Sequence, residues 1–180
     1  MNAIAAVREK LFGDVLACRD VRPAAFEPRV PDDSRRQSVF ARSEALLRAL
    51  AVVEDSARQD DSDAQHESVL QRIEAKLDLL TTLVASLASA QATDPLCEIE
   101  WSARGAWLDA VIPVGTTGLL RVQPADWLPS PLLLPATVIA TDGSGVLLGF
   151  DDLPPALEAA LERHLFRQHR RAVAESRRPR

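Results

Sequence analysis

The sequence predicts an α+β protein built from a small antiparallel β-barrel of five or six strands, a C-terminal helix and a long heptad-patterned helical segment. From Cys97 onward, short apolar runs with period-two alternation are separated by Gly, Pro, Asp and Ser, which is typical of antiparallel strands. Between Leu70 and Leu87, apolar residues recur in alternating steps of three and four, as in a coiled coil or helical bundle. After Pro154 the chain returns to helix formers up to about Glu175.

Composition predicts a cytoplasmic protein without membrane insertion. The chain has 180 residues, 47% of them hydrophobic, enough for one core or for a domain of roughly 100 residues with an accessory element. The formal net charge of −5 provides no basic field, so nucleic acid is not an expected partner. Cys18 and Cys97 are too few for a disulfide-stapled secreted domain. Polar residues interrupt every stretch that could act as a signal peptide or membrane helix.

Changes in composition and in hydrophobic periodicity divide the chain into three predicted segments. Residues 1–30 form a short N-terminal segment with one helical turn and a candidate first barrel strand near Leu16 to Arg22. Residues 34–92 form a two-helix oligomerisation segment that would be inserted after that strand. Residues 95–180 form the rest of the barrel and the C-terminal helix.

The two helices of the middle segment have recognisable ends. The first should start near residue 34, where preceding Asp and Ser side chains can cap the helix, and should end in the acidic stretch 54–63. The second should start at Ser62, where Gln65 completes a capping box, and should continue to just before Pro95. The prediction is therefore two helices joined by an acidic loop.

The second of these helices carries the clearest periodic signal, which we call the heptad stripe. Its a and d positions are Leu70, Ile73, Leu77, Leu80, Val84 and Leu87. Val69 and Leu83 widen the face at g, beyond what a two-stranded coiled coil requires. Since each such side chain contributes roughly 1.5–3 kcal/mol when buried, the stripe favours a homo-oligomer, with a tetramer as the preferred state. An intramolecular hairpin packed on its own barrel is the alternative.

Short apolar runs separated by turn residues predict the strands of the barrel. They cover residues 97–101, 105–111, 116–122, 132–140 and 145–150. Asp142-Gly143 gives the strongest hairpin signal, because Asp-Gly easily adopts the positive φ values of a tight turn.

Three motifs occur in a fixed order in the second half of the chain. They are Glu100-x-Ser102-x-x-Gly105, Gly149-Phe150-Asp151-Asp152-Leu153 and Leu165-Phe166-Arg167-Gln168-His169-Arg170. Together they resemble the PilZ family over residues 97–171. The resemblance implies a small antiparallel barrel closed by a C-terminal helix and, typically, the sensing of cyclic di-GMP.

The resemblance also implies where such a ligand would bind. In the family, an Arg-x-x-x-Arg pair just before the barrel grips guanines and phosphates, for which planar guanidinium groups are suited. The Asp or Asn and the Ser of the strand motif add hydrogen bonds. The ligand-binding candidates here are therefore Glu100, Ser102 and Gly105, although Ser102 and Gly105 could equally build only a turn and a strand start.

This sequence departs from the family pattern at the arginines and at Glu100, which is one methylene longer than the usual Asp. Arginines four residues apart occur only on the C-terminal helix, where Arg167 is spaced four from both Arg163 and Arg171. Arg19 and Arg22, near the barrel entrance, are spaced three apart, which leaves a distorted site there as an alternative. Because a dianionic dinucleotide would lack charge compensation, we expect no binding of cyclic di-GMP by the usual mode and no other cofactor.

No pattern in the sequence predicts catalysis or a metal site. The three histidines fall on predicted helices, and no Ser-His-Asp set, metal-spaced cluster or phosphate-binding glycine loop occurs. The arginine-rich C-terminus from Arg163 to Arg180 is either a solvated helix end or a face for an anionic partner. The sequence thus predicts a non-catalytic oligomeric adaptor in bacterial signalling that presents degenerate PilZ-like barrels to a protein partner. The alternative is a cyclic di-GMP sensor with an altered site.

Overall fold

The computed structural model describes residues 3–29, 32–56, 66–88 and 94–177. The helices are α1 (Ala3–Phe12), α2 (Asp33–Ser56), α3 (His66–Ala88) and α4 (Pro155–Ser176). The strands are β1 (Cys18–Glu27), β2 (Leu96–Trp101), β3 (Gly105–Leu108), β4 (Thr117–Val122), β5 (Leu132–Thr141) and β6 (Val146–Phe150). This confirms the predicted α+β class.

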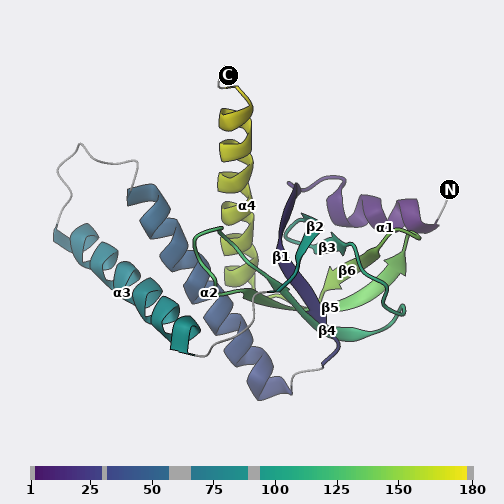
Figure 1. The fold of residues 1–180 in the computed structure, drawn as a ribbon, viewed down its shortest axis with the longest axis horizontal. Helices are drawn as coiled ribbons and strands as arrows, with labels where there is room; N and C mark the ends of the chain where they lie inside the picture. The colour runs from purple at the N-terminus through teal and green to yellow at the C-terminus, as the bar shows by residue number, and fades with distance from the viewer. Residues whose placement is uncertain (1–2, 30–31, 57–65, 89–93, 178–180) are drawn as a thin grey trace.

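The six strands form a closed antiparallel barrel in the order β1-β2-β3-β6-β5-β4. Strand β1 closes it by pairing with two neighbours: Cys18 to Pro23 lie opposite β2, and Ala24 to Glu27 lie opposite β4. The strand expected near Leu16 to Arg22 therefore exists, but it begins at Cys18 and is longer than expected. The α2–α3 pair enters the chain between two adjacent barrel strands (Figure 1).

Alternation along the strands fills the barrel with apolar side chains. On β2, Ile99 and Trp101 are fully buried, and on β4 Leu120 and Val122 are fully buried, as period two requires. The wall is completed by Leu132, Leu134, Ala136 and Val138 of β5 and by Val146 and Leu148 of β6. These positions are the ones that the alternating runs marked as strands.

The β5–β6 hairpin has the turn that Asp142-Gly143 predicts. Gly143 has a φ of +87°, which a residue without a Cβ adopts at little cost. The Asp142 carboxylate accepts hydrogen bonds from the backbone N–H groups of Ser144 at 3.0 Å and Gly145 at 2.9 Å. The turn is thus held by its own aspartate.

Helices α4 and α2 share the core of the barrel. Leu157, Leu161 and Leu165 on the first half of α4 are buried, next to Leu47 and Leu50 of α2. The second half of α4 extends away from the barrel (Figure 1). Helix α3 packs on α2, on the side of α2 away from the barrel.

The N-terminal segment contains more helix than the single turn expected within residues 1–30. A ten-residue helix, α1, begins at Ala3 and ends at Phe12. Its apolar residues Ile4, Val7 and Leu11 have helical spacing, and the charged residues Arg8, Glu9 and Lys10 lie between them in sequence. The helix is ten residues long, below the length at which an isolated helix is stable, so its packing on the barrel stabilises it. In the part of the chain that the structure describes, no helix combines the length and apolarity needed to span a membrane.

Candidate functional site

Helix α1 covers the strand motif that the sequence singled out (Figure 1). Ser102 is fully buried, and its Oγ donates a hydrogen bond to the carbonyl oxygen of Leu11 at 2.8 Å. The same Oγ accepts a hydrogen bond from the backbone N–H of Arg104 at 3.0 Å. The Leu11 carbonyl lies in the last turn of α1, where carbonyls have no partner within the helix. Ser102 therefore caps α1 and also orders its own turn.

Gly105 allows two close approaches at the start of β3. A Cβ at this position would lie 2.1 Å from the carbonyl oxygen of Leu148 on β6 and 2.8 Å from Cδ2 of Leu11 on α1. Both distances are well inside van der Waals contact. The glycine is thus required by the packing of β6 and α1 against β3.

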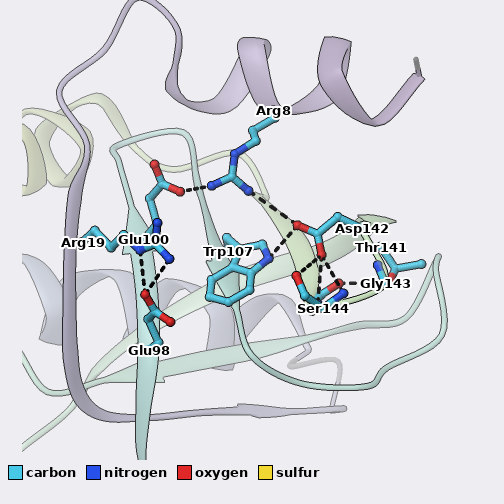
Figure 2. Close-up of polar contacts among 10 residues, drawn as sticks. Arg8, Arg19, Glu98, Glu100, Trp107, Thr141, Asp142, Gly143 and Ser144 are labelled. Carbon is cyan, nitrogen blue, oxygen red and sulfur yellow. Dashed lines mark hydrogen bonds and ion pairs between the residues drawn. The ribbon is translucent and has the colours of Figure 1, made fainter.

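Glu100 forms an ion pair with Arg8 of α1 (Figure 2). The other terminal nitrogen of Arg8 lies 3.6 Å from the Asp142 carboxylate, which also accepts a hydrogen bond from Nε1 of Trp107 at 2.9 Å. Two carboxylates from different parts of the barrel therefore converge on one arginine of α1.

We call this surface of the barrel the α1 cradle. It consists of Glu100, Ser102, Arg104, Gly105, Trp107, Asp142 and Leu147. Leu11, which is 3% exposed, packs on Trp107 and Leu147 in a small apolar cluster separate from the main core. Next to the C-terminal end of α1 lies a cavity of about 460 Å³, lined in part by Leu11 and Arg104.

Arg104 holds the C-terminal end of α1 to the cradle. One of its terminal nitrogens donates a hydrogen bond to the carbonyl oxygen of Lys10 at 3.2 Å. The guanidinium also pairs with Asp14, just after the helix. The hydrogen bond and the charge of Arg104 lower the pKa of Asp14. A cation at this position also suits the negative end of the helix dipole.

The two arginines near the barrel entrance are already paired within the chain. Arg22 is 5% exposed, is paired with Asp20, and donates to the carbonyl oxygen of Gln123 at 2.9 Å. Its guanidinium lies over the ring of Trp101, 5.1 Å from the centroid. Arg19 donates from Nε to Glu98 at 2.7 Å. A phosphate ligand would have to compete with these carboxylates.

The arginines spaced four apart lie on α4 and also have partners. Nε of Arg167 lies 3.1 Å from Glu54 of α2, and a terminal nitrogen of Arg171 lies 2.9 Å from the same carboxylate. Nε of Arg163 donates to the carbonyl oxygen of Ala159 at 2.9 Å. Arg167 and Arg171 thus join α4 to α2.

The histidine on the buried face of α4 is neutral. Burial, with the nearby charges of Arg167 and Arg22, lowers the pKa of His164 to about 3. Its side chain is fully buried beside Trp101. Over the described ranges, no group of three or more His, Cys, Asp and Glu residues could hold a metal ion.

Most of the heptad stripe points to solvent in the single chain. The exposed members are Val69, Leu70, Ile73, Leu77, Leu80 and Val84, with exposures between 42% and 64%. Leu83 is an exception, because it packs against the core of its own chain. Leu87 belongs to α3, but its side chain lies outside the described residues.

A different face of α3 packs on α2. Ala75 and Leu79 are buried there, at 7% and 4% exposure, and neither belongs to the stripe. The intramolecular hairpin therefore forms without covering the six exposed members of the stripe. The pairing of α3 with α2 differs from the alternative predicted from the sequence, a hairpin packed on its own barrel, because α3 packs on α2 and leaves most of the stripe exposed.

Comparison with known proteins places this arrangement in a family. Residues 47–178 match the atypical PilZ domain, described as a cyclic di-GMP receptor. The chain belongs to the atypical PilZ family. No curated protein matches this PilZ chain.

One solved structure is similar to this PilZ chain over nearly its whole length. It is a pathogenic protein from Xanthomonas campestris, described as a new tetrameric PilZ domain self-assembled via an unusual helical bundle. The two chains are 40% identical, with a TM-score of 0.74, over 94% of this chain and 97% of the other. The PilZ resemblance of the strand motif and the C-terminal helix is therefore confirmed.

Sequence reasoning located the strand motif but missed what covers it in this PilZ domain. Arg8, Leu11, Trp107 and Asp142 were not predicted to lie near Glu100 and Ser102. The helical spacing of Ile4, Val7 and Leu11 was the available signal for α1. Its position could not be predicted, because the contact between Leu11 and Ser102 spans 91 residues of sequence.

Proposed function

We propose that this PilZ protein is a non-catalytic adaptor that assembles through α3 into a tetramer and presents its barrels to a protein partner. The observation that carries the proposal is the heptad stripe, which leaves six large apolar side chains exposed along one face of α3. Exposed apolar surface of this extent marks an interaction site in soluble proteins. The oligomerisation residues are then Val69, Leu70, Ile73, Leu77, Leu80, Leu83, Val84 and Leu87.

Leu83 has a mixed role in this proposal. It packs on the core of its own chain, so it would fix α3 on α2 while the stripe meets other copies. The related Xanthomonas campestris protein, which self-assembles via a helical bundle, supports a tetramer over a dimer. Four stripes facing one another would bury side chains that a single chain leaves in water.

Sedimentation equilibrium of charge-bearing stripe variants tests the assembly. Leu77→Asp or Leu80→Asp would place carboxylates beside their symmetry copies, where burial and mutual repulsion both oppose association. We expect the wild-type protein to have the mass of four chains at micromolar concentration and each variant to have a smaller mass. Asp78→Ala, at an exposed α3 position outside the stripe, is the matched control and should leave the mass unchanged. A wild-type mass of one chain would overturn the proposal.

The α1 cradle supports an adaptor over a sensor. Ser102 and Glu100, the ligand-binding candidates with polar side chains, are bonded to Leu11 and Arg8 of the same chain. The arginines near the barrel entrance are paired with Asp20 and Glu98. Cyclic di-GMP would therefore have to displace α1 and break ion pairs in a protein of net charge −5.

Sensing of cyclic di-GMP is the second candidate function, and the family description favours it. In that case Glu100, Ser102 and Gly105 would contact the ligand after α1 moves away. Isothermal titration of the purified protein with cyclic di-GMP separates the two candidates. We expect no saturable heat in the micromolar range. Saturable binding that Ser102→Ala abolishes would establish a sensor and contradict the adaptor.

A further inference from the structure

We propose that the α1 cradle is an exchangeable helix-docking site, in which a basic amphipathic helix of the protein partner replaces α1. This inference rests on the proposed adaptor function, because it specifies the surface and the chemistry of the partner contact. Helix α1 shows what the cradle accepts: an arginine at one position and a leucine three residues later, Arg8 and Leu11.

The polar groups of the cradle are held in place by the barrel itself. Asp142 accepts hydrogen bonds from Trp107, Ser144 and Gly145, all of which lie on or between strands. Burial raises the pKa of Asp142, but these bonds outweigh it and keep the pKa below its usual value, so the carboxylate is charged. Glu100 lies opposite Trp107 in the β2–β3 ladder. The Asp142 carboxylate would therefore stay oriented without α1, and Glu100 would keep its position on β2 beside it.

Two side chains of the cradle also bind backbone carbonyl groups at the end of a helix. Ser102 donates to the carbonyl oxygen of Leu11, and Arg104 donates to that of Lys10. The last carbonyl groups of every α-helix lack partners within the helix. These two donors can therefore bind the carbonyl groups in the C-terminal turn of another helix. Such recognition does not depend on the side chains of Leu11 and Lys10.

Helix α1 is suited to leave the cradle. It is ten residues long, and Leu11 is the one buried residue among its described side chains. Ile4, Val7 and Phe12 are partly buried, and Arg8 is 37% exposed on its side chain. Short terminal elements with few buried contacts open more readily than the core that supports them.

The chemistry of the cradle defines the incoming helix. Glu100 and Asp142 require a cation at one position, and the space that Leu11 occupies over Gly105, beside Trp107 and Leu147, admits one branched apolar side chain. One helical turn separates these two sites, so the partner helix carries Arg or Lys followed three residues later by Leu. An acidic helix would face two carboxylates at short range and is rejected.

A peptide supplied in trans tests whether the cradle accepts a helix. The probe is a fluorescein-labelled synthetic peptide of residues 3–14, and its binding to the full-length protein is followed by fluorescence anisotropy. In the wild-type protein the tethered α1 competes at a high effective concentration. In Leu11→Asp, the buried carboxylate expels α1 and frees the cradle. We expect one peptide per chain on Leu11→Asp, with an affinity at least about tenfold higher than on the wild-type protein.

Two controls identify the surface. A peptide carrying Arg8→Glu should not bind Leu11→Asp, and adding Glu100→Lys to the protein should weaken binding of the unchanged peptide. Circular dichroism shows whether Leu11→Asp remains folded. If it does not, Arg8→Glu in the full-length chain is a milder variant that also releases α1. Equal binding to the wild-type and released proteins, or no binding to either released variant, overturns the proposal. Sedimentation of the same samples reports the assembly, so failure of the tetramer is distinguished from failure of the docking site.

Discussion

The hydroxyl of Ser102 donates a hydrogen bond to the carbonyl oxygen of Leu11 at 2.8 Å, which joins the end of β2 to the last turn of α1. Both groups are buried, and they lie 91 residues apart in sequence. A serine that belongs to a ligand-associated motif of the PilZ family therefore has a structural role in the described chain.

Ser102→Ala should destabilise the folded protein. The substitution leaves the Leu11 carbonyl without its donor, and an unsatisfied buried group costs about 1–3 kcal/mol. Urea unfolding followed by circular dichroism measures the change. Ser38→Ala is the matched control, because Ser38 bonds to the Ser34 carbonyl on the exposed face of α2 and its loss should cost less than about 0.5 kcal/mol. Equal stability of the two variants would argue against capping by Ser102.

Glu54→Ala should reduce stability far more than Glu44→Ala. Glu54 is 7% exposed and binds Arg167 and Arg171, so its loss leaves a partly buried arginine unpaired, at a cost of about 2–3 kcal/mol. Glu44 pairs with Arg48 on the surface of the same helix, where such pairs contribute less than about 1 kcal/mol. Thermal unfolding of both variants provides the comparison. Similar melting temperatures would mean that the Glu54 pairs do not hold α4 to α2.

The free energy of unfolding should decrease as the pH is lowered, because His164 is buried in its neutral form. The pKa of this residue is about 3 in the folded protein, whereas an exposed histidine has a pKa of 6.5. The unfolded chain therefore binds the proton first, so the stabilisation is complete above the unfolded pKa and is lost as pH falls from 6.5 towards 3. The slope from one group reaches about 1.4 kcal/mol per pH unit. His164→Leu should unfold with a shallower pH dependence than the wild type, and identical slopes would contradict a neutral buried His164.

Leu50→Ala and Leu80→Ala should separate folding from assembly. Leu50 of α2 is fully buried in the core that the barrel and α4 share, so its truncation should cost about 2–5 kcal/mol at any protein concentration. Leu80 is 56% exposed in the single chain, so its truncation should weaken association and affect stability only where the protein is assembled. Urea unfolding at two protein concentrations distinguishes the cases. A concentration-independent loss for Leu80→Ala would place this residue inside the chain's own core.

The barrel strands could be predicted because each one carries its own signal. Period-two alternation marked β2 and β4, and Asp142-Gly143 marked the β5–β6 turn, since the side-chain direction and the turn geometry depend on adjacent residues. The first strand was placed less accurately, because Pro23 and its neighbours lack clear alternation. Its full length follows from pairing with both β2 and β4.

The sequence by itself determined the α+β class, the two middle helices and the heptad stripe, because local periodicity decides which side chains share a face. It could not decide which face of α3 packs on α2. Ala75 and Leu79 take that role, and the more apolar stripe stays exposed. Only the tertiary structure placed α1 on Glu100, Ser102 and Gly105, because ion pairs and close packing between distant segments depend on how the whole barrel closes. For the same reason, the motif residues could be named from the sequence but their partners could not.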